Sequence, residues 1–278
     1  MSVFHPYGLM IALATLVAYI VSFFRKKNYG FSSDDLDNLT LFLIPLGIIG
    51  ARLYHVFDRW DFYQNNLSQI WAVWNGGLGI YGGIAGGVVG VIIFNVKRGK
   101  KLKTNHQQLI TVFDFLMPPL AVGQAIGRWG NFLNHEVFGG PTDLPWKWYI
   151  SENLRPEFWE NYSYFHPTFL YESLWCFLGF MILIALESKF TGPAGTCFAR
   201  IFLQNKKDRT KLVSSLTNFN PGLLTGFYTI WYGLGRFFLE FLRFDTAEIF
   251  GLKTAQIISL GLIILGVFLI KRAFAERV

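Results

Sequence analysis

Long apolar segments are the feature that most constrains this chain, because a helix needs about 20 mostly apolar residues to cross a bilayer. Hydrophobic residues make up 52% of the 278 residues and charged residues only 15%, whereas soluble chains carry about 25% charged residues. Seven segments have the required length and composition, at about 5–24, 39–57, 77–95, 109–130, 168–186, 222–243 and 254–270. We therefore expect an all-α, polytopic membrane protein with about seven transmembrane helices.

The positions of Lys and Arg predict how these helices are oriented. Basic residues concentrate around 25–27, 97–103 and 187–220 and in the C-terminal tail, and they are sparse in the alternate loops. The positive-inside rule then puts the N-terminus outside and the C-terminus in the cytoplasm. This distribution accounts for the net charge of +7, so we expect no nucleic-acid partner. The first apolar segment lacks a preceding basic region and a cleavage site, so we expect a retained helix.

The loops suggest one integral membrane domain over residues 1–278 and no second soluble domain. External interfacial segments are expected at about 58–75 and 134–167, because both are rich in Trp and Tyr, which favour the membrane–water boundary. The second of these segments should form a small external cap. A cytoplasmic basic loop is expected at about 187–220, where hydrophobic periodicity is weak.

Cysteine and histidine content argues against metal chemistry. The two cysteines, Cys176 and Cys197, provide no disulfide framework or metal cluster. The five histidines lack the HxxxH and HExxH spacings of metal sites. We therefore expect no metal and no cofactor.

Glycines recur every four residues in the third segment, at positions 79, 83 and 87 and again at 82, 86 and 90. Each row falls on nearly one helical face, which predicts close packing against a neighbouring helix. Tyr81 lies between the rows, where its hydroxyl would point to the place at which helices meet.

The stretch 127–140, GRWGNFLNHEVFGG, crowds polar side chains against the outer end of the fourth apolar segment. Arg128, Asn131, Asn134, His135 and Glu136 fall within nine positions bracketed by glycines. Polar groups beside lipid are costly and are usually functional. We interpret this stretch as the edge of a phospholipid site.

The sixth segment adds a second polar group. Tyr232, Arg236, Glu240 and Arg243 are spaced by four, four and three residues, which puts them on one face of a helix. These residues could belong to a functional site, or Arg236 and Glu240 could form a structural pair that joins helices.

The balance of charges within or beside the apolar segments favours an anionic ligand. Four arginines stand against three carboxylates: Arg52, Arg128, Arg236 and Arg243 against Asp114, Glu172 and Glu240. Guanidinium groups bind phosphate through two points, which lysine does not do. An anionic phospholipid headgroup therefore fits better than a transporter path, an intramembrane hydrolase or a passive scaffold.

These motifs resemble the prolipoprotein diacylglyceryl transferase family. The stretch 127–140 matches its signature G-R-x-G-N-F-x-N-x-E-x-x-G. Five further blocks agree in order: HPYGLM, GARLYHVF, WNGGLGIYGG, HPTFLYES and YGLGRFFLEFLR. Segments 141–165 and 187–220 match poorly.

The resemblance implies an enzyme of the bacterial cell (inner) membrane that carries out the first step of lipoprotein maturation. Such enzymes transfer the diacylglyceryl group of phosphatidylglycerol to the lipobox cysteine thiol of a prolipoprotein signal peptide, forming a thioether and releasing glycerol 1-phosphate. The implied partners are phosphatidylglycerol, the prolipoprotein signal peptide and membrane lipid. The resemblance places Arg128, Asn131, Glu136, Gly139, Tyr232, Arg236 and Glu240 on functional positions. Tyr81 stands where many members carry histidine.

The expected roles follow from the leaving group, because expelling phosphate is harder than ionising a thiol. Arg128 and Arg236 are expected to bind the phosphate, with Asn131 donating a further hydrogen bond. Glu240 would hold Arg236, and Glu136 would either orient Arg128 or bind the glycerol hydroxyls. Tyr232 and Gly139 complete the expected lipid site. Tyr81, Tyr232 and His135 are alternative acceptors of the thiol proton.

Overall fold

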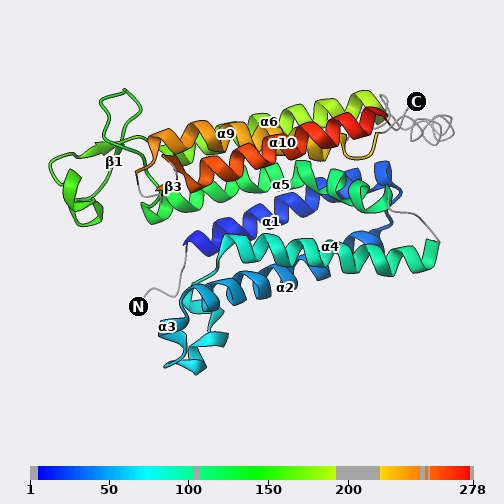
Figure 1. Cartoon of the computed structure of the whole chain (residues 1–278), viewed down its shortest axis with the longest axis horizontal. Helices are drawn as coiled ribbons and strands as arrows, with labels where there is room; N and C mark the ends of the chain where they lie inside the picture. Colours follow the sequence, from blue (N-terminus) through cyan, green and yellow to red (C-terminus); the bar gives the residue numbers. More distant parts are fainter. Residues whose placement is uncertain (1–5, 103–106, 192–219, 245–247, 250, 276–278) are drawn as a thin grey trace. The chain divides into compact units, whose positions relative to one another are not determined.

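The computed structural model describes residues 6–102, 107–191, 220–244, 248–249 and 251–275, most of which are helical (Figure 1). The chain divides into two compact units, residues 29–113 and residues 1–28 together with 114–278. Most of the expected basic loop at 187–220, from residue 192 to residue 219, lies outside the described residues.

The unit formed by residues 29–113 is built on two long helices, α2 (Ser33–Asp58) and α4 (Ile80–Leu102). A short helix α3 (Trp60–Tyr63) and two 3-10 turns, η2 (Leu67–Trp71) and η3 (Val73–Asn75), connect them. Helix α2 begins with a capping box. The Ser32 hydroxyl accepts the Asp35 N–H at 3.0 Å, and the Asp35 carboxylate accepts the Ser32 N–H at 3.0 Å. This exchange satisfies backbone donors that have no partner within the helix.

Glycines bring α2 and α4 into backbone contact. A Cβ on Gly82 would overlap the carbonyl of Gly50, one on Gly86 would overlap that of Leu46, and one on Gly90 would lie 3.0 Å from the Phe42 oxygen. The packing role expected of the 82, 86 and 90 row is therefore confirmed. The row 79, 83 and 87 differs: Gly79 packs against the Tyr54 ring, while Gly83 and Gly87 have only ordinary contacts.

Arg52, on α2, hydrogen-bonds to the segment that connects α2 to α4. Its Nε donates to the Ile70 carbonyl at 2.8 Å, and its Nη1 donates to the carbonyls of Gly76 at 2.7 Å and Gly77 at 3.0 Å. The side chain is buried. Arg52 therefore stabilises the fold of this segment, although its position within an apolar segment had suggested a ligand-binding charge.

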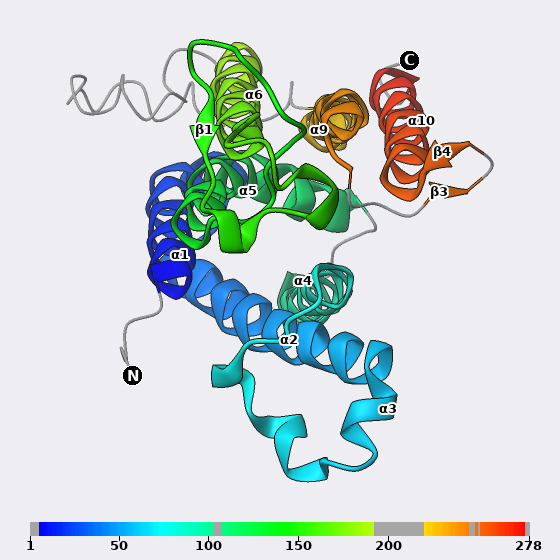
Figure 2. The ribbon, with the colours of Figure 1, turned by 90° about the vertical axis from the view of Figure 1, so that its left-hand side faces the viewer.

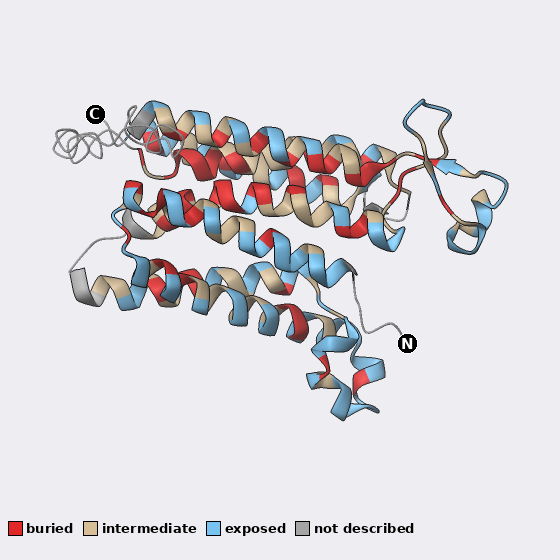
Figure 3. Cartoon of the chain, turned by 180° about the vertical axis from the view of Figure 1, so that it is seen from behind, coloured by how far each residue is buried: buried red, intermediate tan, exposed pale blue. Residues whose placement is uncertain are grey.

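The second unit contains α1 (Pro6–Arg25), α6 (Thr168–Thr191), α9 (Leu223–Leu239), α10 (Thr254–Ala275) and most of α5 (Gln107–Asn134). Helix α9 lies between α6 and α10 and contacts both (Figure 2). Its buried residues lie in its first two turns and at two glycines further along, Gly233 and Gly235 (Figure 3). Helix α5 is joined to α6 by the Ser173–Ala125 hydrogen bond and to α9 by the Tyr228–Gln124 hydrogen bond.

The start of α9 is fixed by a carboxylate from another helix. Asp114, on α5 and fully buried, accepts the N–H of Gly222 at 2.6 Å, the N–H of Thr225 at 2.7 Å and the Thr225 hydroxyl at 2.7 Å. The first N–H groups of a helix have no partner within it, and they favour negative charge. Asp114 therefore acts as a helix cap.

A small folded region follows α5. Strand β1 (Trp148–Tyr149) pairs antiparallel with β2 (Tyr164–Phe165), so that Trp148 faces Phe165. Phe138, Ile150 and Phe165 form its buried centre, against which Trp148, Trp159 and Phe244 pack. A second small sheet pairs β3 (Glu248–Ile249) with β4 (Leu252–Lys253) ahead of α10.

Six of the described helices are long and apolar enough to cross a membrane: α1, α2, α4, α5, α6 and α10. The chain is therefore a multi-pass membrane protein. The segment expected at 222–243 forms α9, which is apolar but only 17 residues long. The structure therefore supports six of the seven expected spanning helices among the described residues, and the seventh stays a prediction.

Candidate functional site

Two arginines and two glutamates form a connected cluster across α5, α6, α9 and the 3-10 turn that follows α9. The Nε of Arg128 lies 2.5 Å from Oε2 of Glu172, and the other oxygen of Glu172 lies 3.3 Å from Nη1 of Arg236. Nη2 of Arg236 lies 2.8 Å from Oε2 of Glu240. One carboxylate on α6 therefore joins an arginine of α5 to an arginine of α9.

Burial differs strongly within this cluster. The Glu240 side chain is completely buried and that of Glu172 is 6% exposed, whereas the side chains of Arg236 and Arg128 are 19% and 28% exposed. The two carboxylates are therefore more deeply buried than the two arginine side chains. A guanidinium has five N–H donors, so each arginine of the cluster keeps donors for an anion besides those that face a carboxylate.

The charges of the four side chains are balanced, because two guanidiniums face two carboxylates. The expected positive excess is therefore not a property of this cluster. The reason is that Glu172 and Glu240 both contact Arg236, and Arg52 donates to backbone carbonyls elsewhere.

Helix geometry explains the Arg236–Glu240 pair, because residues four apart lie on the same face of a helix. The expected pairing is confirmed, but the shared face does not extend to Arg243. Helix α9 ends at Leu239, a 3-10 turn η8 (Glu240–Leu242) follows, and Arg243 has an extended backbone. The Lys253 ammonium donates to the carbonyls of Glu240, at 2.8 Å, and Arg243. A cation at the end of a helix stabilises its free carbonyls, so Lys253 fixes the turn that carries Glu240.

Orienting Arg128 was one of the two roles expected of Glu136, and the structure shows no contact between the two side chains that would provide it. Arg128 pairs with Glu172, whereas Oε1 of Glu136 accepts from Nδ2 of Asn131 at 2.9 Å and from Nδ2 of Asn134 at 3.5 Å. Asn131 is buried, so Glu136 holds its amide in a fixed orientation. The difference arises because Glu136 follows the end of α5, while Arg128 lies within that helix.

The chain leaves α5 through a strained turn. His135 and Val137 have positive φ angles of 52° and 58°, a backbone conformation that side-chain-bearing residues adopt at a cost of about 1–3 kcal/mol. The His135 ring lies against Trp148, with ring centroids 5.5 Å apart, and stacks on Phe132. His135 thus packs between aromatic rings.

Gly139 joins three segments of the chain. Its N–H donates to the His166 carbonyl at 2.9 Å, and the next N–H, that of Gly140, donates to the Leu242 carbonyl at 3.0 Å. A Cβ on Gly139 would lie 2.9 Å from the Leu242 oxygen and 3.0 Å from Thr168 Cγ2. Residues 135–140, which follow α5 and belong to the family signature, are called the signature turn below. Gly139 therefore permits the end of η8 and the start of α6 to approach this turn.

Tyr232 lies one turn before Arg236 on α9 and is partly buried. Its ring stacks on Tyr228 with centroids 5.9 Å apart, and the Tyr228 hydroxyl donates to Gln124 of α5 at 2.8 Å. Cys176 lies 4.0 Å from the same Gln124 oxygen. These side chains form the layer between α5, α6 and α9 that adjoins the charged cluster.

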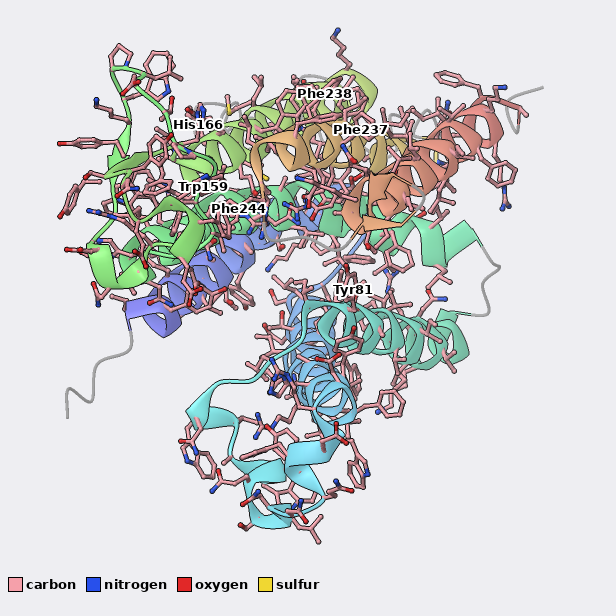
Figure 4. The ribbon with its side chains drawn as sticks, turned by 60° about the vertical axis from the view of Figure 1, so that its left-hand side comes forward. Tyr81, Trp159, His166, Phe237, Phe238 and Phe244 are labelled. Atoms are coloured by element: carbon pink, nitrogen blue, oxygen red, sulfur yellow. The ribbon has the colours of Figure 1, made fainter. Side chains whose placement is uncertain are left out.

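Tyr81 belongs to the other compact unit, near the start of α4 (Figure 4). Its side chain is 49% exposed and its ring lies 5.8 Å from that of Tyr54. The other expected site residues, Arg128, Asn131, Glu136, Gly139, Tyr232, Arg236 and Glu240, all lie in the unit that contains α5, α6 and α9.

A chain of polar contacts at the start of α6 was not assigned from the sequence. The Trp146 indole donates to the Tyr171 hydroxyl at 2.7 Å, and Nδ1 of His166 lies 3.3 Å from that hydroxyl. Partial burial lowers the pKa of His166 below its usual value. The HPTFLYES block contains His166, Tyr171 and Glu172, so its polar residues were the signal from which these contacts could have been predicted. Trp159 and Phe244, labelled in Figure 4, pack against each other with ring centroids 4.4 Å apart.

Fold and site together define a multi-pass helical membrane protein with paired arginines beside a polar signature turn. Residues 2–272 match the model of the prolipoprotein diacylglyceryl transferase family. Proteins named phosphatidylglycerol–prolipoprotein diacylglyceryl transferase are similar over most of their length. The protein of Thermosynechococcus vestitus is 38% identical, covering 94% of this chain and 85% of its own, and that of Thermotoga maritima is 36% identical, covering 97% and 82%. The chain belongs to the prolipoprotein diacylglyceryl transferase family.

Proposed function

We propose that this chain transfers the diacylglyceryl group of phosphatidylglycerol to the cysteine thiol of a prolipoprotein, the first step of lipoprotein maturation. The sulfur attacks the glycerol carbon that bears the phosphate, a C–S bond forms and the C–O bond to phosphate breaks. The electron pair of that bond leaves with glycerol 1-phosphate, and the thiol proton passes to a base. The observation that carries this proposal is the pair of guanidiniums, Arg128 and Arg236, brought together on Glu172.

The departing phosphate explains why two arginines are needed. Negative charge develops on the phosphate oxygens as the C–O bond breaks, and donors fixed in advance stabilise that charge at no reorganisation cost. We assign this role to Arg128 and Arg236, because the N–H groups of a guanidinium form a planar fork that matches phosphate oxygens. Glu240 supports this role, since it lies buried against Arg236.

The signature turn would bind the headgroup next to these arginines. We assign to Asn131 a hydrogen bond to the lipid and to Glu136 the orientation of the Asn131 amide, on the basis of their 2.9 Å contact. Gly139 would act by permitting close approach of three segments, and Tyr232 by lining the lipid site beside Arg236. Tyr81, Tyr232 and His135 are the proposed alternatives for the proton acceptor.

The same proposal includes the membrane arrangement. Counting α9 as a seventh spanning helix puts the N-terminus outside and the C-terminus in the cytoplasm of a bacterial inner membrane. The signature turn and the small β1–β2 region would then lie at the outer face, where the lipobox cysteine of a secreted precursor becomes accessible.

Reconstitution with phosphatidylglycerol and a lipobox peptide tests the function. We expect glycerol phosphate release and a mass increase of the peptide that corresponds to one diacylglyceryl group. A peptide with serine in place of the cysteine is the matched control and should give neither signal. Release of glycerol phosphate that is equal with both peptides would contradict the transfer reaction.

A further inference from the structure

Glu172 occupies a position that neither the signature nor the leaving-group argument accounts for. It lies on α6, opposite both arginines, and each of its oxygens faces a different guanidinium, at 2.5 Å from Arg128 and 3.3 Å from Arg236. An anion that binds the two guanidiniums must share them with this carboxylate. Glu172 therefore joins the two arginines. It also competes with a bound anion for their N–H donors.

The surroundings of Glu172 hold it in place. The next residue, Ser173, donates its hydroxyl to the Ala125 carbonyl of α5 at 2.8 Å and accepts the Trp129 indole N–H at 3.2 Å. Two residues further along α6, the indole N–H of Trp175 donates to the Trp231 carbonyl of α9 at 3.0 Å. These contacts join α6 to α5 and to α9 directly after Glu172, so the backbone that carries the carboxylate is held and Glu172 presents a fixed negative charge.

A stationary negative charge affects the substrate and the product of the proposed reaction differently. The phosphodiester of phosphatidylglycerol carries one negative charge, while a phosphomonoester carries about 1.5 to 2 near pH 7. Repulsion by Glu172 scales with the charge of the ligand. The carboxylate therefore weakens binding of the released phosphomonoester more than binding of the lipid.

We propose that Glu172 is a positioning residue that holds Arg128 and Arg236 on one carboxylate and, by its charge, favours release of the phosphomonoester product. The inference rests on the proposed function and adds to it a group that discriminates between substrate and product. Because the cluster has two positive and two negative side chains, removal of the Glu172 charge leaves a positive site that retains a dianion.

The test compares Glu172→Gln with the wild-type enzyme in proteoliposomes that contain phosphatidylglycerol and a lipobox peptide. Transfer is measured by peptide mass, with added sn-glycerol 1-phosphate as the inhibitor. We expect the inhibition constant for glycerol 1-phosphate to fall by about tenfold in Glu172→Gln, since a facing charge is lost, while the KM for phosphatidylglycerol changes less. An inhibition constant that is unchanged or higher would overturn the proposal.

Glu172→Asp tests the bridging part independently. Aspartate keeps the charge but is one methylene shorter, so it reaches one guanidinium and not both. We expect its kcat to fall by up to about 10²-fold, as for groups misplaced by about 1 Å, with the inhibition constant within about twofold of wild type. A wild-type kcat in Glu172→Asp would overturn the bridging role, whether or not Glu172→Gln folds.

Glu187→Gln is the matched control, since Glu187 is a second buried glutamate of α6 and pairs with Nε of Arg25 at 2.8 Å. It lies about 22 Å further along the helix at 1.5 Å per residue. This variant should lose stability without a change in the inhibition constant. Failure of the wild-type enzyme to transfer would count against the proposed function, whereas active wild type with an unchanged Glu172→Gln inhibition constant would count against this inference alone.

Discussion

Trp175 and Trp231 hydrogen-bond to each other's backbone across α6 and α9. Each indole N–H donates to the carbonyl of the other residue at 3.0 Å, and the two rings stack with centroids 4.2 Å apart. A Cβ on Gly235 of α9 would overlap the Trp175 indole, and a Cβ on Gly179 of α6 would lie 2.6 Å from the Trp231 ring. This reciprocal contact sets the distance between the helices that carry Glu172 and Arg236.

Gly235→Ala should therefore separate α6 from α9. We expect a loss of about 1–3 kcal/mol in stability, as for overpacked cores, and a fall in transfer activity, because Glu172 moves away from Arg236. Thermal unfolding in detergent and turnover of the folded fraction measure the two effects. Gly261→Ala is the control, since no atom lies within 4 Å of a Cβ at that helical position. Equal behaviour of the two variants would contradict the packing argument.

Arg128→Lys tests the planar fork at the phosphate. Lysine keeps the charge but binds as a point charge, so we expect kcat/KM for phosphatidylglycerol to fall by about 10²–10³, the usual cost of removing one donor to a developing charge. Arg59→Lys is the control, because the Arg59 side chain is 72% exposed. A wild-type kcat/KM in Arg128→Lys would exclude a two-point contact with the phosphate. We expect Tyr81→Phe to lower kcat/KM less than Arg128→Lys does.

Gly139→Ala should disturb the signature turn. The new Cβ meets a backbone oxygen, that of Leu242, at 2.9 Å, and a backbone atom yields less readily than a flexible side chain. We expect a loss of about 1–3 kcal/mol and reduced activity. Gly140→Ala provides the comparison, because its nearest atom would be Trp159 Cη2 at an ordinary 3.5 Å. Thermal unfolding should separate the two variants, and a Gly140→Ala variant that is less stable than Gly139→Ala would oppose this account.

Asp114→Asn should weaken the start of α9. Asparagine provides one acceptor oxygen where the carboxylate accepts three hydrogen bonds, so buried donors lose partners at about 1–3 kcal/mol. We expect a lower unfolding temperature with wild-type KM for phosphatidylglycerol, since Asp114 caps a helix and is not assigned to the lipid. Asp61→Asn, at an exposed position, should leave the unfolding temperature unchanged. A KM change without a stability change would assign Asp114 to the site.

Hydrophobic length and helical period predicted the order of the helices, the glycine contact between α2 and α4 and the Arg236–Glu240 pair, because each depends on residues near one another in sequence. The shorter length of α9 was not predicted. Its start is set by Asp114, which lies on α5, and its end by the 3-10 turn that Lys253 caps. Such contacts join distant parts of the chain and leave no periodic signal.

The partners of individual charges were the hardest feature to predict. The sequence placed Arg128 and Arg236 in one site by their residue types, but it did not indicate that both face Glu172. Glu136 lies close to Arg128 in sequence and was one candidate to orient it, yet Glu136 follows the end of α5 and accepts a hydrogen bond from Asn131. Proximity in sequence predicts contacts within a helix, whereas the partners across three helices depend on packing.

Arg52 has a consequence for where the segment between α2 and α4 can reside. Backbone carbonyls in loops normally rely on water as their donor, and they cannot enter the hydrocarbon region without a substitute. The Arg52 guanidinium supplies that substitute at Ile70, Gly76 and Gly77. Trp71 and Trp74 are 79% and 72% exposed. Their rings can therefore contact lipid chains, while the carbonyls of the same segment keep their hydrogen bonds to the Arg52 guanidinium.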